Sequence, residues 1–228
     1  MSLRFYPFVN GYYHSNKLLK FKLEISAVIA MDLTEMLKPY GHYVLGGAVV
    51  VFLAYIWAKR KEYRAPATIA LSAVLAAVVA IATNVIKVPT PATGGYINLG
   101  DTMVMFSAMV FGPVVGVFAG GVGSALGDII GGYPGWAPIT LVVKGLEGLV
   151  IGYIARRSDN VSTLVIAGIV GGMIMVSGYF AFEAYMFGVP AALTEVPGNT
   201  VQAVTGIIVG TGLATIIKKR YPEVTDLI

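Results

Sequence analysis

The sequence predicts an all-α integral membrane protein, with a bundle of six transmembrane helices and one further helix before it. Two observations lead to this fold class. Of the 228 residues, 57% are hydrophobic and only 12% are charged, and the mean hydropathy is +0.77, whereas a soluble domain carries about 25% charged residues. The apolar residues also gather into runs close to the length of about 20 residues that a bilayer core requires. We therefore expect one compact membrane domain.

Seven apolar runs follow one another along the chain, and each predicts a helix. The first, residues 43–60, is expected to be an extra N-terminal transmembrane helix. The run at 102–111 is short and ends at Gly112-Pro113, because proline has no N–H with which to continue a helix. An N-terminal tail is expected over 1–42 and a C-terminal tail over 218–228. The six-helix domain covers 66–217, with helices expected at 66–86, 102–111, 114–130, 138–155, 163–187 and 200–217.

The first 30 residues are polar and aromatic, and lysines interrupt their apolar runs. They do not form a convincing signal peptide. Met31 opens a start that is more usual for a membrane protein, "MDLTEMLKPYGHYV". We expect residues 1–30 to be a loosely attached tail or a misassigned start. The chain has no cysteine, which excludes disulfides and thiolate metal sites.

Basic residues between the spans predict how the bundle is oriented in the cell membrane. They gather in alternate connections, and such connections lie on the cytoplasmic side. The six-helix domain is therefore expected to begin and end in the cytoplasm, with the C-terminus there and the N-terminal tail outside. Five basic residues in that tail weigh mildly against its placement. The basic residues in these connections and after the last span are Lys59, Arg60, Lys61, Arg64, Arg156, Arg157, Lys218, Lys219 and Arg220.

Charged residues inside the spans are few, and all fall in the half that is predicted to face outward. A charge at the centre of a membrane helix costs roughly 2.5–3.5 kcal/mol on insertion scales, so each is a candidate functional residue. Lys144 and Glu147 lie roughly 9–14 Å below the outer end of their helix. Asn199 and Gln202 are expected to open the last helix from outside. The charged set is Asp101, Asp128, Lys144, Glu147 and Glu183.

Polar groups confined to one half of the membrane indicate a pocket open to the outside. A channel would need such groups through the full depth. An interfacial aromatic belt with snorkelling carboxylates is the structural alternative. It does not explain Lys144 and Glu147, which are three residues apart on one helix and lie deep. Aromatic residues gather at the same level as the polar ones: Tyr96, Tyr133, Trp136, Tyr179 and Tyr185.

Two aspartates, Asp101 and Asp128, each follow a Leu-Gly pair. Asp101 stands where a helix N-cap is expected, with or without a ligand contact in addition. Asp128 ends a row of small residues spaced by four, and such rows let helix backbones approach closely in lipid. We expect its helix to be a central packing element. The structural interpretation of Asp128 is a buried carboxylate with Lys144 as its partner.

A second row of small residues lies in the inner half of the helix at 66–86. Ala73 and Ala77 are spaced by four, as are Ala76 and Ala80. This smooth surface is predicted to pack against another helix, either of this chain or of a partner subunit.

The region 66–217 resembles the substrate-binding S components of energy-coupling factor (ECF) vitamin transporters, and most closely the branch named for riboflavin uptake. The resemblance rests on "GGYINLGD", "FGP", "GGVGSALGDIIGGYPGWAP" and "KGLEGL". It implies a six-helix S-component bundle that binds a vitamin or precursor near the outer face, with "KVPTPATGGYINLGD" as a lid. The helix at 43–60 is outside this pattern, and its role stays open.

The resemblance also implies partners. The row Ala73, Ala76, Ala77 and Ala80 would dock onto the transmembrane coupling subunit, which two ATP-binding-cassette ATPases drive. This chain has no GxxxxGK[ST] stretch, so ATP would be used by those partners, and no cofactor, metal or nucleic acid is implied for the chain itself. The expected substrate site, from the resemblance and the polar pattern together, is Tyr96, Asn98, Asp101, Asp128, Trp136, Lys144, Glu147, Tyr179, Glu183, Asn199 and Gln202.

Other functions fit less well. A stand-alone ion-coupled carrier would use Glu147 or Glu183 and would work without an ATPase. An intramembrane aspartyl protease has a Gly-x-Gly-Asp signature, but Asn98 and Ala125 stand where its first glycine would be. A serine-type protease needs a histidine, and the only two, at positions 14 and 42, precede every span. Riboflavin, a pyridoxine-like compound and a thiamine pyrimidine precursor remain open as cargo.

Overall fold

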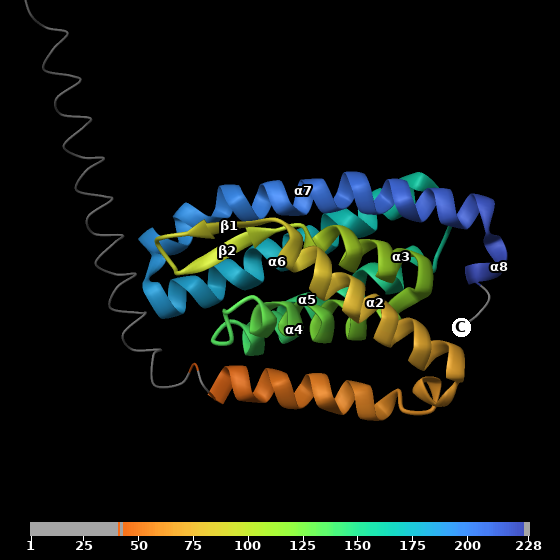
Figure 1. Ribbon diagram of the computed structural model, residues 1–228, viewed down its shortest axis with the longest axis horizontal. Helices are drawn as coiled ribbons and strands as arrows, with labels where there is room; N and C mark the ends of the chain where they lie inside the picture. Colours follow the sequence, from red (N-terminus) through yellow and green to blue (C-terminus); the bar gives the residue numbers. More distant parts are fainter. Residues whose placement is uncertain (1–40, 42, 226–228) are drawn as a thin grey trace, which may run out of the picture.

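The computed structural model describes residues 41 and 43–225, and it is mainly helical (Figure 1). Within this part, five helical segments are long and apolar enough to cross a membrane, which confirms the membrane fold class. The predictions for residues 1–40 lie outside the described residues. The five segments are α2 (Pro66–Val85), Gly100–Ile130, α5 (Ala137–Ala155), α6 (Val161–Phe187) and α7 (Val189–Arg220).

The segment Gly100–Ile130 folds back on itself at Gly112. Within α3 (Gly100–Phe118), Gly112 has φ +75° and ψ −172°, a conformation that L side chains rarely adopt. Pro113 follows and cannot continue the helical hydrogen bonds. A Cβ atom at Gly116 would lie 2.7 Å from Ala108 Cβ, so residues equally far from Gly112 face each other. The break predicted at Gly112-Pro113 is therefore present.

The second arm of this helical hairpin consists of η2 (Ala119–Gly123), a π-helical turn, and α4 (Ser124–Ile130). Its glycines permit close approach to the neighbouring helices. A Cβ at Gly120 would lie 2.5 Å from the Lys144 carbonyl oxygen of α5, and one at Gly123 would lie 2.6 Å from the Ala76 carbonyl oxygen of α2. This arm packs between α2 and α5, as the row of small residues predicted.

A β-hairpin, which the sequence analysis did not predict, joins α2 to α3. Its strands, β1 (Lys87–Thr90) and β2 (Gly95–Asn98), are antiparallel, with Lys87 opposite Asn98 and Thr90 opposite Gly95. Gly94 turns the chain with φ +65°. The hairpin lies at one end of the bundle beside α7, and the basic connections lie at the other end (Figure 1).

The last helix is longer than predicted. It was expected at 200–217, but α7 begins at Val189, and the connection from α6 is Gly188 alone, with φ +87°. Pro190 stands in the first turn, where its missing N–H costs nothing. The expected C-terminal tail also begins later, because α7 continues to Arg220 and a short helix, α8 (Pro222–Thr225), follows.

The alanine row of α2 divides between the interior and the surface. Ala73 and Ala77 are exposed, whereas Ala76 and Ala80 are buried. The helical period turns Ala76 toward Gly123 of the second arm, which its backbone contacts. Ala76 and Ala80 therefore do not belong to an exposed docking surface.

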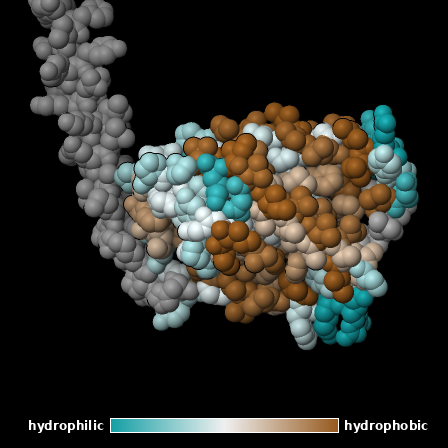
Figure 2. All heavy atoms as spheres, in the orientation of Figure 1, coloured by the Kyte–Doolittle hydropathy of each residue, from teal (hydrophilic) through white to brown (hydrophobic). Residues whose placement is uncertain are grey.

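A helix over Tyr43–Ala58 precedes α2, followed by the short 3-10 helix η1 (Glu62–Arg64). It packs on the bundle through Phe52, which is buried against Gly121 and Gly145. Figure 2 shows apolar residues over the middle of the molecule and hydrophilic residues toward its ends. Such an apolar band fits the hydrocarbon core of a bilayer.

Candidate functional site

A small cavity lies beneath the β-hairpin. Its volume is about 30 Å³, which is room for water rather than for a larger molecule. The walls come from the hairpin, α4, α5, α6 and α7. The lining residues are Thr90, Thr93, Gly95, Tyr96, Asn98, Asp128, Trp136, Thr140, Tyr179, Glu183, Glu195, Asn199 and Gln202.

The structure brings most of the expected substrate site together at this cavity. The residues in its lining are Tyr96, Asn98, Asp128, Trp136, Tyr179, Glu183, Asn199 and Gln202. The other three, Asp101, Lys144 and Glu147, are not part of the lining and form a separate buried cluster. The sequence analysis missed the lining residues Thr90, Thr93, Gly95, Thr140 and Glu195.

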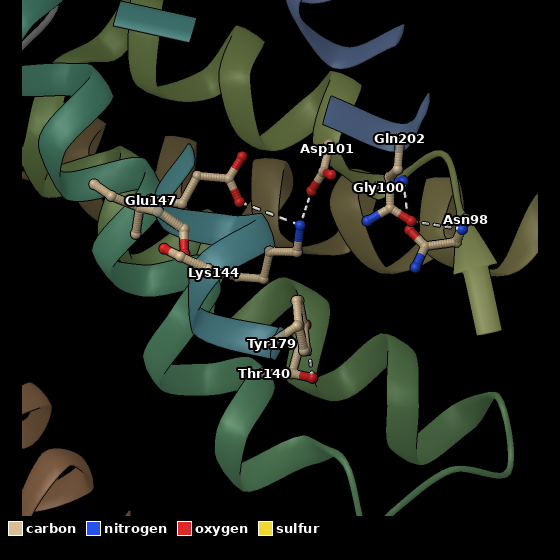
Figure 3. Close-up of polar contacts among 10 residues, drawn as sticks. Asn98, Gly100, Asp101, Thr140, Lys144, Glu147, Tyr179 and Gln202 are labelled. Carbon is tan, nitrogen blue, oxygen red and sulfur yellow. Dashed lines mark hydrogen bonds and ion pairs between the residues drawn. The ribbon is translucent and has the colours of Figure 1, made fainter. Parts of the chain in front are cut away.

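The buried cluster joins α3 to α5 through Lys144 (Figure 3). The Lys144 Nζ donates to Asp101 Oδ1, and Glu147 Oε2 lies 3.2 Å from the same nitrogen. The three side chains are only 3%, 1% and 0% exposed, in the order Lys144, Asp101, Glu147. Asp101 and Glu147 supply the carboxylate partners that a lysine buried this deeply requires.

Asp101 does not cap its helix, contrary to the structural interpretation from sequence. Helix α3 begins at Gly100, its N-cap residue is Leu99, and Asp101 lies inside the first turn. The capping role falls instead to Asn98, whose Oδ1 accepts a hydrogen bond from the Gly100 amide at 2.7 Å. Asp101 is thereby free to pair with Lys144.

Asp128 pairs with the hairpin, so the prediction that Lys144 is its partner was wrong. The Tyr96 hydroxyl of β2 donates to Asp128 Oδ1 at 2.6 Å. Burial, and then the hydrogen bond and charge of Asp128, raise the pKa of Tyr96 well above its ordinary value. The hydroxyl therefore stays protonated and donates at any physiological pH. This contact ties the hairpin to the end of α4.

Helix α7 holds the other side of the hairpin. The Asn98 amide donates to Gln202 Oε1 at 2.8 Å, and Thr93 Oγ1 donates to Glu195 Oε1 at 3.0 Å. Glu195 was missed because residues 188–199 were expected to be a connection. The sequence signal that could have found it is an acidic residue in an otherwise uncharged stretch, seven residues before Gln202.

An aromatic wall closes the side of the cavity between α5 and α6. The Trp136 ring lies 6.3 Å from the Tyr179 ring and 6.0 Å from the Phe187 ring, centroid to centroid. The Tyr179 hydroxyl donates a hydrogen bond to Thr140 Oγ1 at 3.0 Å (Figure 3). Flat rings beside convergent polar groups are typical of sites for small planar molecules. Among the described residues, no three His, Cys, Asp or Glu residues are placed to hold a metal ion.

A helical membrane protein with a polar and aromatic cavity under a hairpin belongs to the class of small-molecule binding or transport proteins. The sequence matches the family described as "ECF-type riboflavin transporter, S component" over residues 64–219, and the chain belongs to this family. This membership makes it a transporter subunit of the ECF type, as the resemblance implied.

Three relatives illustrate the similarity. An uncharacterized protein in a gap 3′ region of Pyrococcus woesei is 46% identical over 148 residues, which are 65% of this chain and 99% of the relative. A UPF0397 protein of Streptococcus agalactiae is 38% identical over 73 residues, 32% of this chain and 39% of the relative. A UPF0397 protein of Streptococcus pneumoniae is 33% identical over 69 residues, 30% of this chain and 37% of the relative.

Proposed function

We propose that this protein captures a small heteroaromatic vitamin or vitamin precursor outside the cell, as the S component of an ATP-driven ECF transporter. The observation that carries the proposal is the cavity beneath the hairpin, where aromatic rings and polar groups converge at one end of the bundle. A planar ligand would stack on Trp136 or Tyr179 and hydrogen-bond with Asn199 and Gln202. Riboflavin, a pyridoxine-like compound and a thiamine pyrimidine all have this general form.

The proposed orientation places the cavity on the outer face. The basic connections at the opposite end of the molecule would be cytoplasmic. The two arms of the helical hairpin would cross the membrane separately, with Gly112 near the cytoplasmic face beside Arg156. This counting gives six crossings for residues 66–220, with the helix Tyr43–Ala58 as an additional one.

Loading would require the β-hairpin to act as a lid. A cavity of about 30 Å³ cannot hold a vitamin, so the described geometry corresponds to a closed site. Three hydrogen bonds hold the lid, from Tyr96 to Asp128, from Asn98 to Gln202 and from Thr93 to Glu195. The site would open when these three hydrogen bonds break, and it would close again when the hairpin contacts the bound ligand.

Energy for uptake would come from partner subunits. A transmembrane coupling subunit with two ATP-binding-cassette ATPases would contact the exposed side of α2 at Ala73 and Ala77. These side chains are small and exposed, so a partner helix could approach the α2 backbone closely.

Ligand identification tests the proposal directly. Compounds released from the detergent-purified protein would be identified by mass spectrometry and then titrated against the protein by tryptophan fluorescence. The chain has two tryptophans, Trp57 and Trp136, so a Trp57→Phe variant reports on the cavity alone and Trp136→Phe serves as the matched control. We expect stoichiometric quenching in the first variant only. No released compound, and no quenching by a panel of vitamins, would contradict the proposal.

A further inference from the structure

The cavity beneath the hairpin is lined by three carboxylates, and no lysine, arginine or histidine is among its lining residues. Asp128 comes from α4, Glu183 from α6 and Glu195 from α7. Glu195 lies close enough to Glu183 for the two to interact electrostatically. Buried carboxylates that converge from three helices require positive charge or protons to be stable.

In the part of the chain that the structure describes, two lysine ammonium groups lie near this end of the bundle, and their hydrogen bonds and ion pairs are made to groups other than the three carboxylates. Lys144 is paired with Asp101 and Glu147 below the cavity. Lys87 donates to Asn84 Oδ1 at 2.9 Å and to the Gly131 carbonyl oxygen at 3.2 Å. Lys87 therefore acts on Asp128 only through space. The cavity keeps an excess of negative groups.

Two of the three carboxylates have an oxygen atom with no hydrogen-bond partner. Glu183 Oε2 has no hydrogen-bond partner, and Asp128 Oδ2 has none beyond an interaction of its carboxyl group with the Thr140 side chain; each residue is only 4% exposed. The remaining oxygen of Asp128 accepts from Tyr96, and Asn199 hydrogen-bonds to Glu183. Leaving a buried charged acceptor unpaired is costly. These two oxygens are therefore placed to receive donors from a bound molecule.

The aromatic residues of the lining favour the same kind of ligand. Tyr96, Trp136 and Tyr179 line the same cavity as the carboxylates, and the faces of such rings attract cations. Lys87 lies over the Tyr96 ring and Lys144 over the Tyr179 ring, so Trp136 is the lining ring that offers its face to a bound cation. We infer that the bound molecule is a planar heteroaromatic cation with a fixed charge, such as a thiazolium, held by Asp128 and Glu183. This inference rests on the proposed function and narrows its substrate class. A neutral flavin would bring N–H donors but would leave the negative charge uncompensated.

The test compares ligands that differ in charge on the otherwise unchanged protein. Thiamine, its neutral isostere with a thiophene in place of the thiazolium, and riboflavin would each be titrated by Trp136 fluorescence. We expect thiamine to bind at least tenfold more tightly than the neutral isostere. Equal binding of the two, or tighter binding of riboflavin, would overturn the inference and leave the proposed vitamin capture intact. Binding of none of the three would overturn the inference, and the released compound and the panel of vitamins then decide the proposed vitamin capture.

Single substitutions test whether the carboxylate of Glu183 binds the charged ligand. Glu183→Gln is nearly isosteric and should weaken thiamine binding at least tenfold while changing the affinity of the neutral isostere less than twofold. Asp159→Asn, which removes an exposed carboxylate near the other end of α6, should change neither. An equal loss for both ligands in Glu183→Gln would overturn the charge argument, because a general distortion of the site affects the two alike. The wild-type comparison stands even where this variant fails to fold.

Discussion

At the scale of single residues, the buried charged groups divide into a structural set and a set that lines the cavity. Lys144 forms ion pairs with Asp101 and Glu147 beneath the cavity. Asp128, Glu183 and Glu195 line it and contact the hairpin or each other. The depth of the polar residues predicted that they would gather at one end. Their pairing was not predictable from the sequence. Asp101 begins the first arm of the helical hairpin and Asp128 ends the second, and because the chain turns at Gly112 both lie at the same end of the bundle as Lys144.

The structural set gives a prediction for stability. Lys144→Met removes the only cation between two buried carboxylates and should destabilise the protein by about 3–5 kcal/mol. Glu147→Gln should cost far less, because neither of its oxygens accepts a hydrogen bond of ordinary geometry and Asp101 remains to pair with Lys144. Thermal unfolding in detergent measures both. Equal losses in the two variants would contradict this ranking.

At the scale of elements, glycine contacts determine how the helices pack. The small-residue row predicted the close packing of the second hairpin arm. The β-hairpin was not predicted because its strands have only four residues each and are rich in residues that disfavour strands. Pro89 lies in β1, Gly94 lies at the turn and Gly95 begins β2. The start of α7 was also missed, since Pro190, Pro197 and Gly198 are typical of a connection. Helical packing against the hairpin overrides that local preference.

Adding one methyl group tests this packing. Gly116→Ala places a Cβ 2.6 Å from the Gly148 carbonyl oxygen and 2.7 Å from Ala108 Cβ. Overpacking of this kind typically costs 1–3 kcal/mol, so the unfolding temperature should fall. Gly135→Ala is the matched control, because nothing lies within 4 Å of its added Cβ. If both variants unfold at the wild-type temperature, the helices do not approach as closely as described.

At the scale of the whole molecule, the two ends of the bundle differ in their chemistry. The cavity and its hairpin occupy one end, and the basic connections occupy the other (Figure 1). Ala73 and Ala77 are exposed on α2 and lie outside the cavity lining, and Ala73 lines a groove between α2 and the helix Tyr43–Ala58. Binding and coupling to partner subunits should therefore be separable by mutation.

Ala77→Trp separates the two roles. The large side chain should block a partner helix and abolish uptake in cells that express the complete transporter, while ligand affinity of the purified protein stays within twofold of wild type. Ile208→Trp, at a lipid-exposed position of α7, is the control and should leave uptake unchanged. Normal uptake by Ala77→Trp would remove this side of α2 from the docking surface. Uptake without any ATPase would point to an ion-coupled carrier instead.

The most direct measurement of the central claim is an experimental structure of the protein with the ligand that co-purifies with it. The account predicts ligand density beneath the β-hairpin, stacked on Trp136 or Tyr179 and in contact with Glu183. The hairpin should be displaced outward from the position described here, since the closed cavity is too small. Ligand density anywhere else, such as between the helix Tyr43–Ala58 and α2, would contradict the account.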